Sequence, residues 1–274
     1  MHIDTRSARI WVHQQGQGPA VLLLGGLGDP AEAWQAQIDA FAGRYRTVAP
    51  DNRGAGRSPL PPGGVSIPAM AEDAAAVLRE LGIEQAHVAG FSMGGAIAQE
   101  LAIAHPDLVR SLVLSGTWTR PDAYCRQMIE SWIVAARNAS SERDLLEAFF
   151  LWIYSARAHE DGTVARLIDE TLASPLAQGP DAFFATAQAC LDWEGAERRL
   201  AAVAAPALVI AGDTDIACPP RHSHVIAAAI RDAELVTMPG EAHQPFQEVP
   251  FEYNAIVERF WARVERSERI AEAA

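Results

Sequence analysis

The sequence contains no lysine, because all 22 of its basic residues are arginine. Schiff-base and pyridoxal-phosphate chemistry require a lysine amine. A standard nucleotide-binding P-loop also requires a lysine, which contacts the phosphates. The composition therefore excludes these three kinds of site.

Positive charge is scarce as well, since 35 acidic residues outnumber the 22 basic ones and leave a formal net charge of −13. Affinity for nucleic-acid backbones comes from clustered positive charge, and anionic membranes attract proteins in the same way. We therefore expect neither a nucleic-acid partner nor a membrane partner.

Cysteines and long apolar runs are also few. The three cysteines, Cys125, Cys190 and Cys218, are scattered without the spacing of metal ligands, which suits a reducing compartment better than a disulfide framework. The first 18 residues carry charges and lack the apolar region of a signal peptide, and no later stretch gives about 18 uninterrupted apolar residues. We expect a globular, cytoplasmic protein.

Short apolar runs that end in glycine or a polar turn alternate with longer segments of helical periodicity. This alternation is typical of an α/β protein with a parallel sheet covered by helices on both faces. The predicted strands are Ala20 to Leu24, Thr47 to Pro50, His87 to Gly90, Arg110 to Leu114, Ala207 to Ala211 and Glu234 to Met238.

A long stretch between the fourth and fifth predicted strands has only helical patterns. We therefore divide the chain into a first core part (1–116), a helical cap (117–203) and a second core part (204–274). The cap holds ten of the 20 aromatic residues and could line an apolar pocket, for which Trp118 and Trp152 are candidates. The alternative is that its aromatic residues form only its own small core. Predicted cap helices include Leu145 to Arg157, Val164 to Ser174 and Asp181 to Trp193.

One motif points to nucleophilic catalysis. The segment Gly90-Phe91-Ser92-Met93-Gly94 follows an apolar strand and opens a helical pattern, as a G-x-S-x-G nucleophile elbow requires. A serine at the tip of such a strained turn enters the site, and the helix behind it directs N–H groups toward the reacting oxygen. The glycines keep strand and helix from clashing.

Two later loops supply partners for Ser92. Asp213 and Asp215 follow the strand that ends at Ala211, and His243 follows the strand that ends at Met238. Catalytic groups of open parallel sheets lie at the carboxyl ends of strands, and the chain order serine, acid, histidine is the one that this architecture requires. The sequence thus predicts a Ser-His-Asp triad.

With these motifs in order, the chain resembles the α/β-hydrolases with a helical cap, and is similar to 3-oxoadipate enol-lactonases and related small esterases. The resemblance includes Gly25 to Gly28 before Trp34, and Asp51 to Ser58. It implies that Asp215 is the triad acid and that Asp213 is a turn residue.

The resemblance also implies an oxyanion hole formed by the backbone N–H groups of Leu27 and Met93. Many relatives have His-Gly where this chain has Gly25-Gly26, but a backbone donor survives a side-chain change. Asp29 is unusual at this place. We expect it to cap the helix that starts near Pro30, and contact with the substrate is the alternative.

The implied function is that of a serine hydrolase that cleaves a small, largely apolar carboxylic ester or lactone through an acyl-enzyme, without metal or organic cofactor. Relatives with the same triad cleave carbon–carbon bonds of ring-fission products, hydrolyse thioesters or act as cofactor-free haloperoxidases, so these reactions stay open. Acidic substrates would call for a cap arginine, with Arg120, Arg126 and Arg157 as candidates, although we expect each of them to be a solvated surface charge. A homodimer is also left open.

Two other patterns compete with this interpretation. Gly26-x-Gly28-x-x-Ala31 with Asp51 downstream matches a dinucleotide-binding fingerprint and would indicate a nicotinamide-dependent dehydrogenase. His222 and His224 have a spacing that binds metal on a strand, but here they begin a helical pattern in which they do not share a face, so we predict no metal site.

Overall fold

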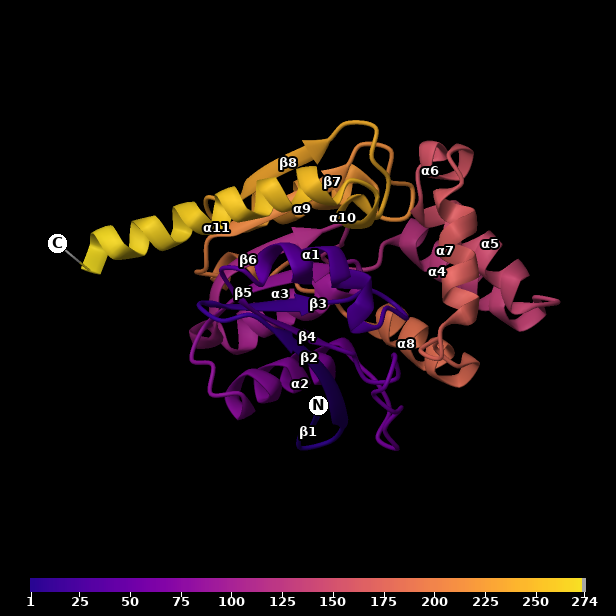
Figure 1. The fold of residues 1–274 in the computed structure, drawn as a ribbon, viewed down its shortest axis with the longest axis horizontal. Helices are drawn as coiled ribbons and strands as arrows, with labels where there is room; N and C mark the ends of the chain where they lie inside the picture. Colours follow the sequence, from indigo (N-terminus) through magenta and orange to yellow (C-terminus); the bar gives the residue numbers. More distant parts are fainter. Residues whose placement is uncertain (273–274) are drawn as a thin grey trace.

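The computed structural model describes residues 1–272, which form one eight-stranded sheet flanked by helices (Figure 1). The strand order is β1-β2-β4-β3-β5-β6-β7-β8. The pairs β1·β2 and β2·β4 are antiparallel, and all other pairs are parallel. The strands are β1 (His2–Asp4), β2 (Arg9–Gln15), β3 (Ala20–Leu24), β4 (Arg46–Pro50), β5 (Ala86–Phe91), β6 (Val109–Ser115), β7 (Ala207–Gly212) and β8 (Glu234–Met238).

The six predicted strands all exist and form the parallel part of the sheet, which confirms the predicted fold class. The prediction missed β1 and β2 at the antiparallel edge. In β2, the buried Ile10 and Val12 alternate with partly exposed Trp11 and His13. This period of two is typical of a strand with one solvent-exposed face. The surrounding polar residues made the pattern hard to identify in the sequence.

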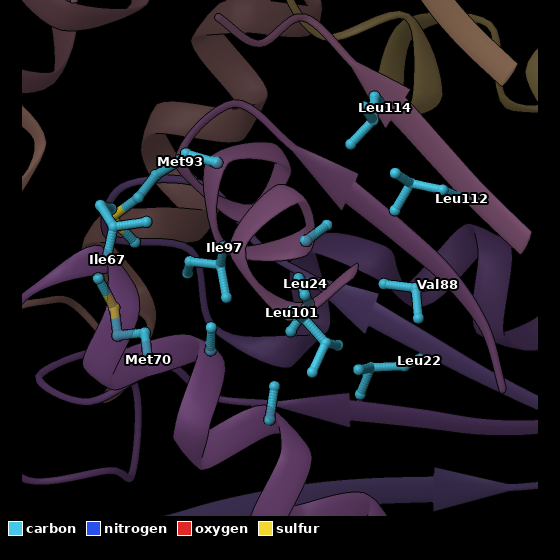
Figure 2. Close-up of a cluster of buried hydrophobic side chains, with 14 of the residues drawn as sticks. Leu22, Leu24, Ile67, Met70, Val88, Met93, Ile97, Leu101, Leu112 and Leu114 are labelled. Atoms are coloured by element: carbon cyan, nitrogen blue, oxygen red, sulfur yellow. The ribbon is translucent and has the colours of Figure 1, made fainter. Parts of the chain in front are cut away.

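Helices cover both faces of the sheet, and the strand side chains alternate between them. Leu22 and Leu24 of β3 pack with α2 (Ile67–Glu80) and α3 (Met93–Ala104), as Figure 2 shows. Val21 and Leu23 point to the other face, where α1 (Gln35–Phe41) and α11 (Pro250–Glu272) lie. The remaining core helices are η1 (Ala31–Trp34), η2 (Pro106–Leu108), η3 (Leu200–Ala202), α9 (Pro220–Ala229) and α10 (Pro245–Glu248).

Besides η3, the segment between β6 and β7 contains five α-helices, which lie together at one end of the molecule, opposite the C-terminus (Figure 1). They are α4 (Ala123–Asn138), α5 (Glu142–Ile153), α6 (Ala156–Glu160), α7 (Thr163–Ala173) and α8 (Pro180–Asp192). The predicted helix Leu145 to Arg157 is two helices, because Ser155 starts a new one as its N-cap. The boundaries of the proposed cap at residues 117 and 203 stay a prediction. Within residues 1–272, no helix is both long and apolar enough to cross a membrane.

Helix α3 packs very close to the end of strand β3, as the glycines of the elbow motif predict. A Cβ atom on Gly94 would lie 2.1 Å from the carbonyl oxygen of Leu24, and one on Gly90 would lie 2.3 Å from the carbonyl oxygen of Gly94. Both neighbours are backbone atoms and cannot turn away. The contact between α3 and the end of β3 therefore requires glycine.

We expect Gly94→Ala to lower the free energy of unfolding by about 3 kcal/mol or more, because the added methyl group must push the backbones of α3 and β3 apart. Chemical denaturation measures this loss. The matched control is Gly43→Ala, since a Cβ there would meet no atom within 4 Å. Equal stabilities of the two variants would contradict the proposed close contact.

Candidate active site

Ser92 lies at the sharp turn between β5 and α3, with φ 52° and ψ −118°. Such a backbone conformation is strained for a residue with a side chain, at a cost of about 1–3 kcal/mol, and persists only where its surroundings hold it. Here the N–H of Ser92 donates to the carbonyl of Ser115 (3.0 Å), and the Thr117 hydroxyl donates to the carbonyl of Ser92 (2.7 Å). The elbow is thus held from the end of β6.

The structure brings the three predicted triad residues together. His243 Nε2 lies 3.2 Å from Ser92 Oγ, and His243 Nδ1 lies 2.8 Å from Asp215 Oδ2. A carboxylate only accepts hydrogen bonds, so Nδ1–H donates to Asp215 and Nε2 is left to accept the Ser92 proton. Asp215 Oδ1 accepts the N–H of Cys218 (2.7 Å), and Asp213 Oδ1 accepts the N–H of Gly240 (2.6 Å). Asp213 is therefore the turn residue.

The His243 ring rests among groups that sequence reasoning missed. The Phe91 ring centroid lies 4.7 Å from that of His243, and it lies at the same distance from that of Phe246. A Cβ on Gly116, whose φ is +50°, would lie 3.1 Å from His243 Nδ1. These residues fix the plane of the imidazole, and only Phe91 carried a sequence signal, because it lies within the elbow motif.

The two backbone groups predicted as oxyanion donors lie on segments that the α3–β3 contact holds together. Met93 begins α3 directly after Ser92, and Leu27 lies in the loop after β3. Among the described residues, neither N–H donates to a protein acceptor. The first N–H groups of a helix have no partner within it and carry a positive partial charge. The start of α3 is therefore suited to bind an anion.

Asp29 does not cap a helix, which corrects the expectation from the sequence. The N-cap of η1 is Pro30, without a side-chain cap. Instead, Asp29 Oδ2 folds back to accept the N–H of Gly26 (2.8 Å), and Asn52 Nδ2 donates to the carbonyl of Gly25 (3.1 Å). These two side chains brace the loop that carries Leu27, where many relatives have His-Gly.

The dinucleotide-binding interpretation of Gly26, Gly28 and Asp51 is wrong. Asp51 is fully buried, and both of its oxygens are engaged: Oδ1 accepts the N–H of Ala31 (2.7 Å), and Oδ2 accepts the N–H of Arg57 (2.8 Å). The carboxylate that would bind a ribose hydroxyl thus holds the start of η1 and the turn after β4 instead.

The loop of His243 is tied both to the loop of Asp215 and to α6. The carbonyl of Glu241 accepts the N–H (3.0 Å) and the hydroxyl (2.8 Å) of Thr214, next to the triad acid. The buried carboxylate of Glu241 accepts two hydrogen bonds from Arg157 (3.0 and 2.8 Å). Paired bonds of this kind fix orientation as well as distance. Arg157 therefore holds the loop of His243 to α6, a role that neither of its two sequence-based interpretations, substrate contact or solvated surface charge, included.

A cavity of about 510 Å³ opens between the Leu27 loop and the inserted helices. Its walls are mostly apolar, as in small-molecule sites. They include Leu27, Gly28, Asp29 and Pro30 on the core side, and Leu145, Leu146, Phe149, Phe150, Leu176 and Phe183 on the insertion side.

The two tryptophans predicted to contact the substrate are not among the residues that line this cavity. Trp118 is buried in the core, and Trp152 is partly buried against the same core. Phe149 and Phe183 do line it, whereas Trp132 supports Phe149 from behind at a centroid distance of 4.7 Å. The aromatic residues of the insertion therefore divide between a cavity wall and a small core.

The remaining candidates lie away from the cavity. Arg120 pairs with Glu197 on the surface (3.0 Å), and Arg126 is exposed. His222 is buried, 3.5 Å from Cys125 Sγ, whereas the exposed His224 contacts the carbonyl of Pro220 (2.8 Å). The two histidines thus do not form a common site.

The fold, the elbow and the loop order are those of one family. Residues 19–249 match the family described as the alpha/beta hydrolase fold. The match covers most of the chain, so this protein belongs to the α/β-hydrolases.

The chain is similar over nearly its whole length to several hydrolases. It is 32% identical over 263 residues to a protein of Azorhizobium caulinodans named as a candidate carbamate hydrolase, RutD, with 94% of this chain and 97% of that protein covered. A hydrolase structure from Pseudomonas aeruginosa has a TM-score of 0.85 at 27% identity, covering 95% of this chain and 97% of that one. The enol-lactonase structure from Burkholderia xenovorans has a TM-score of 0.86 at 23% identity, covering 96% and 100%, and shows the shared fold.

We expect Arg157→Ala to lower kcat about 10-fold while KM changes little, because a small displacement of the histidine loop weakens proton transfer more than binding. Arg157→Lys should recover only part of the loss, since lysine cannot make the paired contact with Glu241.

Steady-state kinetics on an activated ester measures both variants. Arg120→Ala is the matched control, because it removes an exposed arginine whose partner Glu197 is also exposed. If the control lost as much activity as Arg157→Ala, the ion pair between Arg157 and Glu241 would have no particular role in activity.

Proposed function

We propose that this protein is a serine hydrolase that cleaves a carboxylic ester or lactone of a small, largely apolar substrate through an acyl-enzyme. The observation that carries the proposal is the continuous chain of hydrogen bonds from Asp215 through His243 to Ser92. It ends beside two backbone N–H groups that have no protein acceptor among the described residues. This is the constellation required for acyl transfer by an activated hydroxyl.

In the proposed reaction, Ser92 Oγ attacks the carbonyl carbon while its proton passes to His243 Nε2. The N–H groups of Leu27 and Met93 stabilise the oxyanion, each by a few kcal/mol of barrier. The bond to the leaving alkoxide then breaks, and His243 returns the proton to it. Water attacks the acyl-enzyme by the same route, with His243 as base, and releases the acid and free Ser92.

The cavity supports a substrate without negative charge. None of the residues that line it is basic, and its two charged residues are Asp29 and Glu142. A carboxylate group on the substrate would have no cation to compensate for its desolvation. We therefore favour esters and lactones without a carboxylate group over those that carry one, although the fold is shared with an enol-lactonase.

Carbamates are the second candidate, because the relative from Azorhizobium caulinodans is named for that activity. The same three residues would serve, with a carbamoyl group on Ser92 in place of an acyl group. The carbamate nitrogen donates electron density into the carbonyl, so this reaction depends more strongly on the oxyanion donors.

We expect Ser92→Ala to lower the turnover of short p-nitrophenyl esters by a factor of about 10³ or more, because no other hydroxyl replaces the nucleophile. Labelling by a fluorophosphonate, detected by mass spectrometry at residue 92, should disappear in the same variant. Ser267→Ala, on the exposed side of α11, is the matched control and should keep both properties. Retained turnover in folded Ser92→Ala would overturn the proposal.

A further inference from the structure

The side chain of Asp29 is a carboxylate at the core-side wall of an otherwise largely apolar cavity. The residue lies two positions after Leu27, on the loop that would meet the substrate carbonyl. The other charged lining residue, Glu142, is exposed at the start of α5. Asp29 is therefore the ionisable group nearest to the proposed oxyanion donors along this wall.

Only one of the two Asp29 carboxylate oxygens forms a hydrogen bond within the described part of the protein. Oδ2 accepts the N–H of Gly26, whereas no group among the described residues donates to Oδ1. Oδ1 is not among the enclosed side-chain atoms that have no partner, so it is accessible, and a ligand that supplies a donor can form a charge-assisted hydrogen bond with it. The bracing of the Leu27 loop therefore does not account for the second oxygen.

The electrostatic surroundings are consistent with this picture. Burial raises the pKa of Asp29 to about 6, and the bond from Gly26 and the charge of His243 oppose that rise. Burial raises the pKa of Tyr154, the charge of Asp29 adds to that rise, and the Tyr154 hydroxyl donates to Gln247 (2.6 Å). At neutral pH the cavity thus contains a poorly compensated negative charge.

A negative charge beside the oxyanion hole works against catalysis on a purely apolar substrate, because the charge that develops on the carbonyl oxygen is also negative. A substrate that brings an N–H donor to Asp29 weakens this repulsion and gains a charge-assisted hydrogen bond. Sites built around such a bond discriminate strongly against analogues that lack the donor.

We propose that the cavity is a subsite for a nitrogen-containing group of the substrate, whose N–H donates to Asp29 Oδ1. This inference rests on the proposed serine-hydrolase function and specifies its substrate class: a largely apolar ester or lactone with an amide or amine nitrogen. It gives Asp29 two separate roles, because Oδ2 braces the loop and Oδ1 selects the substrate.

The variant Asp29→Asn separates the two roles. The amide oxygen of asparagine can still accept the N–H of Gly26, so the Leu27 loop keeps its brace, while the charge and the second acceptor are lost. Asp39→Asn is the matched control, since Asp39 is an exposed residue of α1 that contacts Gln35.

The test uses p-nitrophenyl esters of equal chain length whose far ends are a primary carboxamide, a dimethylcarboxamide, an ammonium or a methyl group. A second series carries these groups on the alcohol side. For the wild type and the Asp39→Asn control, we expect kcat/KM for the primary carboxamide or the ammonium ester to exceed that for the dimethylcarboxamide and methyl esters about 10- to 100-fold. Comparison of the primary carboxamide ester with the ammonium ester shows whether the subsite prefers a neutral or a cationic group.

In Asp29→Asn this preference should fall at least 10-fold, while turnover of the methyl ester rises. That rise should grow as the pH increases through about 6, because only then does Asp29 of the wild type lose its proton and repel the oxyanion. Equal ester preferences in the wild type and Asp29→Asn would overturn the subsite. If Ser92 were labelled and the methyl ester hydrolysed without a donor preference, the subsite alone would fail; without labelling or turnover, the proposed function would fail.

Discussion

The close approach of helix α3 to the end of strand β3 is the contact on which the whole site depends. Because Gly94 has no side chain, the first turn of α3 packs against the carbonyl oxygens of Leu24 and Gly25. That position places the helix N-terminus beside the loop of Leu27 and forces Ser92 into a strained conformation. The positions of the proposed nucleophile and oxyanion donors thus follow from one steric condition, and the hydrogen bonds from the end of β6 stabilise this arrangement.

The other two residues of the proposed triad depend on a second constraint, the pairing of parallel strands β7 and β8. Their carboxyl ends lie side by side, so the loops of Asp215 and His243 meet at one edge. Bonds between the loops then refine their distance: Asp213 with Gly240, and Thr214 with Glu241. Glu241 also pairs with Arg157 of α6, so the insertion is connected directly to the loop that carries His243.

Much of this arrangement could be predicted from the sequence, because the relevant signals are local. Apolar runs before polar turns predicted the parallel strands, and the order of Ser92, Asp215 and His243 predicted which loops meet. Strand β2, which lies between β1 and β4, was missed because its buried residues are only two, Ile10 and Val12, among polar neighbours.

The roles of Asp29 and Arg157 could not be predicted, because they depend on contacts between segments rather than on spacing. Asp29 turns back to Gly26 only in the observed loop conformation, and Arg157 finds Glu241 only once the insertion folds over the histidine loop. The same limit applies to Trp118, since residue type predicts an aromatic wall but not which ring faces the cavity.

The scarcity of positive charge acquires a structural meaning at the cavity. Apart from histidine, the basic residues of this chain are all arginines. Three of them form ion pairs within the fold: Arg53 pairs with Asp73, Arg57 with Asp51, and Arg157 with Glu241. None lines the cavity, which leaves Asp29 without a cation. A partly buried carboxylate whose one hydrogen bond comes from a backbone N–H is poorly compensated, so further compensation must come from a proton or from the substrate. With burial already raising its pKa, Asp29 lies near the balance between the two, and an N–H donor in the cavity decides that balance in favour of the charged form.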